Sequence, residues 1–386
     1  MLKQLSAVTS RVTALLAPVY SLFPQSTQLK RALTAGVFSL SSLSAATHAG
    51  FHEDLAYYHA PIHYQDTDNT FYPGDYITAI DYDFDWISNN NWDHLSNGLW
   101  PATVYYSVVE SCSHYFITYA FFHPRDWDDK AFQNEHENDL EGALFMVKKD
   151  GSNYGRMQAM ITVFHNDFYA YTAPDSGIAN GHEDIDGSIS FSDYDGSARA
   201  KTAQEAKGHG LKAWPYIPDF KGESNRDGII YYPTRGAGEY PSSGNDRMVK
   251  YELVDILEPN GFWSQQLNEA NMPSQTFSTW GTFQGNNSGG CGSGWKNCSN
   301  NAAHTPWRWD DKDDGASYKG EFAMHPAQLF DHYFDNLGNY SHHYIDNRYL
   351  SDLRAAGFSA SFTPQGFTEN LNLDQMYASL NGQCSQ

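Results

Sequence analysis

Short runs of β-branched, aromatic and other apolar residues, separated by turn-forming residues, most constrain how this chain can fold. They occupy residues 102–111, 114–122, 142–149, 156–171, 228–234 and 248–256. Runs of this length, bounded by Asn, Asp, Gly and Ser, are typical of β-strands. The best helix signals are at residues 197–210 and 325–337 only. The pattern therefore predicts a mainly β protein, built as a β-sandwich with few short helices.

The composition changes after about residue 260, where Gly, Asn and Trp become frequent and aliphatic residues become rare. Tryptophan side chains in such a segment need a place to bury. They are Trp280, Trp295, Trp307 and Trp309. We therefore expect residues 50–260 to form the sandwich and residues 261–386 to form a loop-rich C-terminal extension that packs on it.

The first 49 residues have the layout of a signal segment. A basic pair, Lys30 and Arg31, precedes an apolar and small-residue run that ends in Thr-His-Ala before Gly50. An amphipathic helix of the mature protein fits less well, because the segment carries no acidic residue. We predict that residues 1–49 are a leader and that the protein is secreted and extracellular. We expect no membrane span beyond the leader, because no apolar run there reaches about 18 residues.

The cysteines favour disulfides, because an even number of them, 4, occurs in a chain expected to be exported. The glycine-rich segment around Cys291 and Cys298 has the form of a loop closed by one disulfide. That pairing leaves Cys112 to pair with Cys384. A zinc site is not predicted, because there is no CxxC pair and the cysteines do not cluster with histidines.

The formal net charge is −22, which excludes nucleic acid as a favoured partner. Such a chain suits divalent cations, cationic partners or neutral sugars better. The alternative is that acidity only keeps a secreted protein soluble. The sequence also offers no P-loop, GxSxG or well-placed GxGxxG motif, so neither a nucleotide nor serine-hydrolase chemistry is predicted. We expect a monomer.

The segment NEHENDLEG at residues 134–142 gathers acidic residues and a histidine directly before an apolar run. Side chains two apart on a strand face the same way, so Asp139 and Glu141 are expected to share a face. His136 lies just upstream, and a hairpin with the preceding strand would bring Asp126 beside it. Carboxylates this close repel one another unless a cation or shared protons compensate. This ligand set suits Mg²⁺, Ca²⁺ or Mn²⁺ better than zinc.

Other interpretations of this segment are excluded by spacing or stay open. The HExxH motif of zincins fails because position 140 is Leu, and the HxxEH motif of inverzincins fails at positions 139 and 140. A glycosidase pair, with carboxylates about 5–9.5 Å apart, stays open for Asp139 and Glu141. A solvated acidic turn before a buried strand is the simplest alternative.

A second acidic segment, HTPWRWDDKDDG at residues 304–315, combines tryptophans with aspartates. Stacking of Trp307 or Trp309 on a sugar, or Ca²⁺ binding by the aspartates, would give it a function. It lacks the EF-hand pattern with its closing Glu. Buried tryptophans with solvated aspartates are the alternative.

The sequence ITYAFFHPRD…EHENDLEGALFMV resembles the core of the necrosis-inducing NPP1-like family (the NLP cytolysins) and of the related Vps62-like proteins. In that family a strand ends in an aromatic-Pro-Lys-Asp turn, and a Gly-His-Arg-His-Asp-Trp-Glu heptapeptide and an apolar strand follow. FHPRD and EHENDLE occupy those places here. The resemblance implies a divalent-cation site at the rim of a β-sandwich, formed by Asp126, His136, Asp139 and Glu141.

The chain departs from the family heptapeptide at Glu135, Asn138 and Leu140, where the family has its leading glycine, its second histidine and its tryptophan. The resemblance also implies a histidine ligand well downstream. His209, which is flanked by glycines, is the candidate for it, and His165 is the competitor.

What the resemblance implies for function is a secreted, non-enzymatic protein of the cytolysin or virulence type. Its cation would help to recognise a membrane lipid headgroup or a glycan of a target cell. The alternative is a metal-dependent extracellular hydrolase of phosphoester or glycoside bonds, with Glu141 or His136 as base. The first interpretation is preferred because the cluster holds no obvious spare base once its carboxylates are ligands, and no catalytic residue is assigned.

Overall fold

A computed structural model of the chain describes residues 50–95, 100–127, 134–165, 167–217, 227–270, 274–285, 297–299, 301–312, 320–360, 362–365, 371–380 and 384. The described part of the chain is mainly β with short helices, as the sequence predicts. Residues 50–59 are helical. Within the described residues, no helix combines the length and the apolar character needed to cross a membrane.

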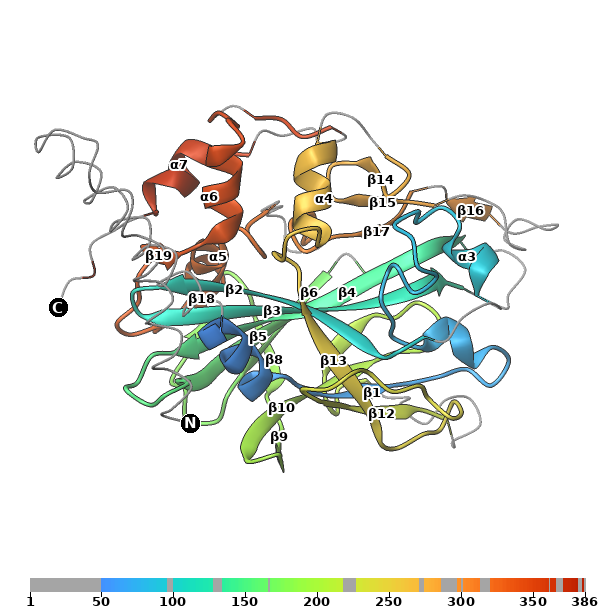
Figure 1. Cartoon of the computed structure of the whole chain (residues 1–386). Helices are drawn as coiled ribbons and strands as arrows, with labels where there is room; N and C mark the ends of the chain where they lie inside the picture. The colour runs from blue at the N-terminus through green and yellow to red at the C-terminus, as the bar shows by residue number, and fades with distance from the viewer. Residues whose placement is uncertain are drawn as a thin grey trace, which may run out of the picture. The chain divides into compact units, whose positions relative to one another are not determined.

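Most strands belong to one mixed sheet of 14 strands (Figure 1). Its main path has the order β11-β10-β1-β12-β13-β2-β3-β4-β5-β6-β8, while β16, β19 and β9 pair beside β4, β2 and β10. The bounds are β1 (Ile62–Gln65), β2 (Thr103–Ser111), β3 (His114–Asp126), β4 (Asn134–Lys148), β5 (Arg156–Phe164), β6 (Asp167–Thr172), β8 (Ile185–Ser188), β9 (Phe191–Tyr194), β10 (Ser197–Gln204), β11 (Leu211–Ala213), β12 (Ile229–Pro233), β13 (Val249–Asp255), β16 (Asn297–Ser299) and β19 (Tyr344–Asp346).

Smaller sheets and helices complete the described chain. One sheet has three strands, β14 (Phe277–Thr279), β15 (Thr282–Gln284) and β17 (Asn301–His304), and another pairs β7 (Ala179–Asn180) with β18 (Phe334–Asp335). The helices are η1 (Tyr72–Asp75), α3 (Asn91–His94), α4 (Phe262–Glu269), α5 (Pro326–Tyr333), α6 (Arg348–Ala355) and α7 (Leu373–Ala378).

Strands β2 to β5 are buried on both faces, which makes them the middle layer of the fold. On β3, Phe116, Ala120 and Phe122 face the apolar cluster to which α4, α5 and α6 contribute. Figure 1 shows α4 and α6 on that side of β2 and β3, with β1 and β10 on the other side. Because side chains alternate along a strand, the residues between them point toward β1 and β10.

The opposite face of β3 packs against the far end of the same sheet. The Phe121 ring stacks on the His63 ring of β1, with centroids 4.2 Å apart. Strand β11, at one end of the main path, contacts β4 and β5, so the sheet curls back on itself. The layers of the predicted sandwich therefore come from one curled sheet.

Residues 197–210, a predicted helix, instead begin with strand β10, so that prediction was wrong. Strand β10 pairs with β1, β11 and β9. Ala200, Thr202 and Ala203 are buried between these neighbours. Helix propensity is a weak preference that tertiary pairing can override. The predicted helix at residues 325–337 is present as α5.

The C-terminal tryptophans are buried rather than available to a ligand. Trp307 is fully buried and Trp309 is nearly so, while Trp295 lies outside the described residues. The Trp309 indole N–H donates to the carbonyl of Leu140 over 3.0 Å. A Cβ at Gly142 would lie 2.6 Å from the Trp309 ring, so glycine is needed for this approach. Sugar stacking on Trp307 or Trp309 is therefore not supported; Asp313 and Asp314 lie outside the described residues.

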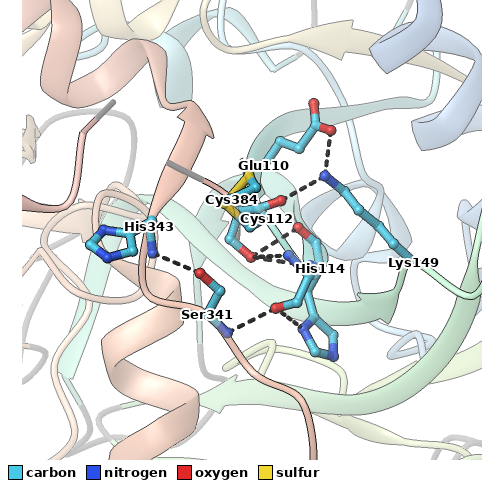
Figure 2. Close-up of a disulfide and its surroundings, with 9 residues drawn as sticks. Glu110, Cys112, His114, Lys149, Ser341, His343 and Cys384 are labelled. Carbon is cyan, nitrogen blue, oxygen red and sulfur yellow. Dashed lines mark hydrogen bonds and ion pairs between the residues drawn. A yellow bond between two sulfur atoms is a disulfide. The ribbon is translucent and has the colours of Figure 1, made fainter. Parts of the chain in front are cut away.

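The predicted Cys112–Cys384 disulfide is present (Figure 2), with a Cα–Cα distance of 5.3 Å and a sequence separation of 272. Beside it, the amide of Cys112 donates to the carbonyl of His343 over 3.0 Å. The C-terminal tail is thus covalently joined to the end of β2. The predicted Cys291–Cys298 pair stays a prediction, because Cys291 lies outside the described residues.

We predict that Cys384→Ser lowers the free energy of unfolding by about 2–4 kcal/mol, because the crosslink restricts the unfolded chain. Urea unfolding under non-reducing conditions measures this. Cys112→Ser should give the same loss, and the double variant should lose nothing more, because both changes remove one bond. A Cys384→Ser protein as stable as the wild type would contradict the prediction.

Candidate functional site

The hairpin of β3 and β4 brings Asp126, the predicted ligand on β3, next to the predicted ligands on β4. Its register pairs Asp126 with His136 and His123 with Asp139. The Nε2 atom of His136 lies 3.3 Å from Oδ2 of Asp126. The structure thus joins the Pro-Arg-Asp turn to the acidic segment as the sequence suggests.

Asn138 interrupts the strand between His136 and Asp139. Strict alternation would place positions 136 and 139 on opposite faces. Asn138 has a φ of 63°, in the left-handed region that Asn tolerates better than most residues. Because Asn138 breaks the alternation, the side chains of His136 and Asp139 need not lie on opposite faces. Asn138 is itself fully buried and has structural partners: Asn91 Nδ2 donates to its Oδ1 over 2.7 Å, and its Nδ2 donates to the carbonyls of Ser88 (2.9 Å) and Gln284 (3.1 Å).

The remaining acidic residues of the segment also have structural partners. Glu135 forms a buried ion pair with Arg125. Glu137 accepts a hydrogen bond from the backbone N–H of Trp92 over 2.7 Å. Leu140 belongs to the apolar cluster on the helix side. The departures from the family heptapeptide at Glu135, Asn138 and Leu140 are therefore packing positions in this fold.

Asp139 and Glu141 share a face, as predicted, and both contact the segment around His209. Oδ2 of Asp139 lies 2.9 Å from Nδ1 of His209. Glu141 accepts hydrogen bonds from the backbone N–H groups of His165 (2.8 Å) and Leu211 (3.2 Å). These fixed partners argue against a pair of carboxylates that face each other across a glycosidase cleft.

The glycines around His209 allow its close approach to the hairpin. A Cβ at Gly208 would lie 2.9 Å from the His165 ring, and a Cβ at Gly210 would lie 2.6 Å from the Phe164 ring. His209 has a φ of 54° and is fully buried. Its ring stacks on that of His123 with centroids 3.8 Å apart.

Protonated histidines balance the buried carboxylates. Burial lowers the pKa of His136, but its hydrogen bond and ion pair with Asp126 outweigh burial and raise that pKa to about 9. Burial likewise opposes the charge on His209, yet hydrogen bonds to Asp139 and Asp75 raise its pKa to about 10.

The pKa values of the two carboxylates of β4, Asp139 and Glu141, shift in opposite directions. Burial favours protonated Asp139, but the hydrogen bond from His209 outweighs it and lowers the pKa of Asp139. Burial and the charge of Asp139 hold the pKa of Glu141 well above its usual range. Asp139 is therefore the ionised member of the pair.

The donor set fits a hard divalent cation by its chemistry, since carboxylate oxygens and an imidazole come from one hairpin. The predicted ligands meet as close pairs, Asp126 with His136 and Asp139 with His209. The first pair is partly exposed, with side-chain exposures of 19% for Asp126 and 23% for His136. The pair of Asp126 and His136 thus reaches solvent, while the pair of Asp139 and His209 is buried.

His165, the competing histidine, is not part of either pair. It occupies the turn between β5 and β6, and its side chain is 44% exposed. Its Nε2 atom lies 3.0 Å from Oε1 of Glu205, and its Nδ1 atom lies 3.6 Å from Oε1 of Glu141. It therefore lies beside the predicted ligands as a separate imidazole.

Among the described residues, ligand atoms of three side chains come together at a place that sequence reasoning missed, whereas the predicted ligands meet only as pairs. Ligand atoms of Asp83, Asp85 and His94 all lie within 4.8 Å of one another. Nδ1 of His94 lies 2.5 Å from Oδ2 of Asp83. The Asp-x-Asp spacing was the available signal, but His94 joins it only through the turns that lead into α3.

No protein-family model matches the chain, and no curated protein does. Solved structures similar to it are of the NLP type, at a distant level. The structure described as non-toxic HaNLP3 has 15% identity and a TM-score of 0.27, over 50% of this chain and 73% of that one. A structure described as a toxin fold for microbial attack and plant defense has 14% identity and a TM-score of 0.25, over 51% of this chain and 72% of that one.

NLPPya in complex with glucosamine has 15% identity and a TM-score of 0.20, over 39% of this chain and 50% of that one. These neighbours are NLP structures, the group that the hairpin motif resembles.

We predict that Asn138→Ala lowers the free energy of unfolding by about 2–3 kcal/mol, because it leaves buried backbone carbonyls without their donor. Urea unfolding measures the loss. Asn138→Gly separates the causes, since glycine tolerates the left-handed φ but also lacks the hydrogen bonds. A glycine variant as stable as the wild type would show that the hydrogen bonds contribute nothing.

Proposed function

We propose that the chain is a secreted binding protein whose Asp126, His136, Asp139 and Glu141 hold a divalent cation at the rim of the curled sheet. The cation would take part in recognising a membrane lipid headgroup or a glycan. The observation that carries the proposal is the register of the hairpin, which opposes Asp126 to His136 and turns Asp139 and Glu141 to one face.

The exposure of the cluster supports a binding role. Asp126 and His136 reach solvent, while Asp139 and Glu141 are more buried, with side-chain exposures of 9% and 5%. A partner would approach from the Asp126 end. Bound there, Mg²⁺, Ca²⁺ or Mn²⁺ would attract phosphate or hydroxyl oxygens of that partner, which lipid headgroups and glycans both carry.

Charge compensation also supports a cation. The net charge of −22 gives the chain little positive charge to spare, and imidazolium groups balance the buried carboxylates. A divalent cation would supply the same positive charge in place of the proton on His136, which must leave before this imidazole can bind a metal ion. Secretion belongs to this proposal, and the Cys112–Cys384 disulfide is consistent with an oxidising compartment.

A metal-dependent extracellular hydrolase of phosphoester or glycoside bonds is the second candidate. The observation that favours it is His165, whose exposed imidazole is paired with Glu205 beside Glu141. Such a histidine could accept a proton from water near the cation. The binding role is preferred because both oxygens of Glu141 accept backbone hydrogen bonds, which leaves this carboxylate in a fixed position.

We predict that Mg²⁺, Ca²⁺ or Mn²⁺ stabilises the wild-type protein relative to EDTA. At a concentration of about 100 times Kd, the gain would be about 2.7 kcal/mol. Thermal melts measure it as a rise in Tm. Asp139→Asn should abolish the rise, while Asp83→Asn, which removes a carboxylate of the group of Asp83, Asp85 and His94, should keep it.

No rise with any of the cations would contradict the proposed site. A rise lost in Asp83→Asn but kept in Asp139→Asn would move the cation to the group of Asp83, Asp85 and His94. Where the rise is found, cation-dependent leakage of liposomes or glycan binding supports the binding role. Turnover of phosphoester or glycoside substrates that is lost in His165→Ala would favour the hydrolase.

A further inference from the structure

Asp75 is a fully buried carboxylate at the end of η1. Its Oδ1 atom accepts hydrogen bonds from the indole N–H of Trp127 (3.1 Å) and the backbone N–H of Lys207 (2.7 Å). Its Oδ2 atom accepts the backbone N–H of Asp68 over 2.7 Å. A carboxyl group with this many fixed donors is held in one position.

One of these donors, Trp127, is adjacent to the first predicted ligand, Asp126. Trp127 directly follows Asp126 in the sequence, and its backbone N–H donates to the carbonyl of Lys207 over 3.2 Å. A Cβ at Gly74 would lie 2.6 Å from Nε1 of Trp127, so the chain before Asp75 is shaped to admit this indole. Asp75 therefore fixes the backbone next to Asp126.

His209 connects Asp75 to the second predicted ligand, Asp139. Its Nε2 atom lies 3.3 Å from Oδ1 of Asp75, and its Nδ1 atom lies 2.9 Å from Oδ2 of Asp139. Both ring nitrogens thus face carboxylate oxygens, and stacking on His123 fixes the ring plane. In this arrangement His209 contacts the predicted ligands through Asp139.

We propose that Asp75 is a positioning residue of the cation site, and that it acts through His209 on Asp139 and through Trp127 on Asp126. This inference rests on the proposed function and gives His209 a different role from that of a direct ligand. Groups that orient metal ligands commonly change metal affinity by about 10–100-fold when they are removed.

The test compares Mn²⁺ binding by the full chain with and without Asp75→Asn, measured from the electron paramagnetic resonance signal of free Mn²⁺. The amide keeps the size of the carboxylate but removes its charge and one acceptor. We expect the affinity for Mn²⁺ to fall by about 10–100-fold. The ¹⁵N resonances of the His209 ring should also shift, and this second readout needs no bound metal.

Asp311→Asn is the matched control. Asp311 is also buried and accepts hydrogen bonds from the Phe168 N–H of β6 (3.3 Å) and the Tyr333 hydroxyl of α5 (2.5 Å). We expect this variant to bind Mn²⁺ like the wild type and to leave the His209 resonances in place. An equal loss of affinity in Asp311→Asn would show that the loss in Asp75→Asn comes from general destabilisation of the fold. That result would overturn the inference.

A folded Asp75→Asn protein with wild-type Mn²⁺ affinity would also overturn the inference. If Asp75→Asn does not fold, His209→Gln breaks the same connection from its other end, and unchanged affinity in that variant has the same consequence. A wild-type protein that binds neither Mn²⁺ nor, in competition or in thermal melts, Mg²⁺ or Ca²⁺ would instead overturn the proposed function. The His209 resonances would still decide whether Asp75 holds the ring.

Discussion

The pairing of β3 with β4 is the interaction on which the rest of the structure depends. These strands are the longest in the described chain, and both of their faces are covered by protein. One face carries the helices and tryptophans of the C-terminal part, and the other carries the far end of the curled sheet. Their continuous register also fixes which carboxylate opposes which histidine, so the core and the candidate site are set by the same hydrogen bonds.

The parts of this arrangement that are close in sequence could be predicted. Strand alternation placed Asp139 and Glu141 on one face, and the short connection between strands placed Asp126 beside His136. The connection to Asp75 could not be predicted, because it links an isolated aspartate to His209 across more than a hundred residues with no periodic signal. The same limit explains why the group at Asp83 was missed.

Local propensity failed where neighbouring strands decided the conformation. Residues 197–204 contain Ala, Lys and Gln, which favour helix, yet they form β10 between β1, β9 and β11. The small side chains that suggested a helix are the ones that fit between two closely packed layers. Asn138 is a related case, since its identity follows from a left-handed φ and from partners at Ser88, Asn91 and Gln284 that no local pattern contains.

Trp309 donates a hydrogen bond to the carbonyl of Leu140, the residue between Asp139 and Glu141 in β4. The indole approaches from the side of the strand opposite to these two carboxylates. The backbone that carries Asp139 and Glu141 is therefore held from both sides. Local opening of the segment around Trp309 would release the strand that the site is built on. The C-terminal part and the acidic cluster should accordingly open as one cooperative unit, so that their amide hydrogens exchange with solvent together.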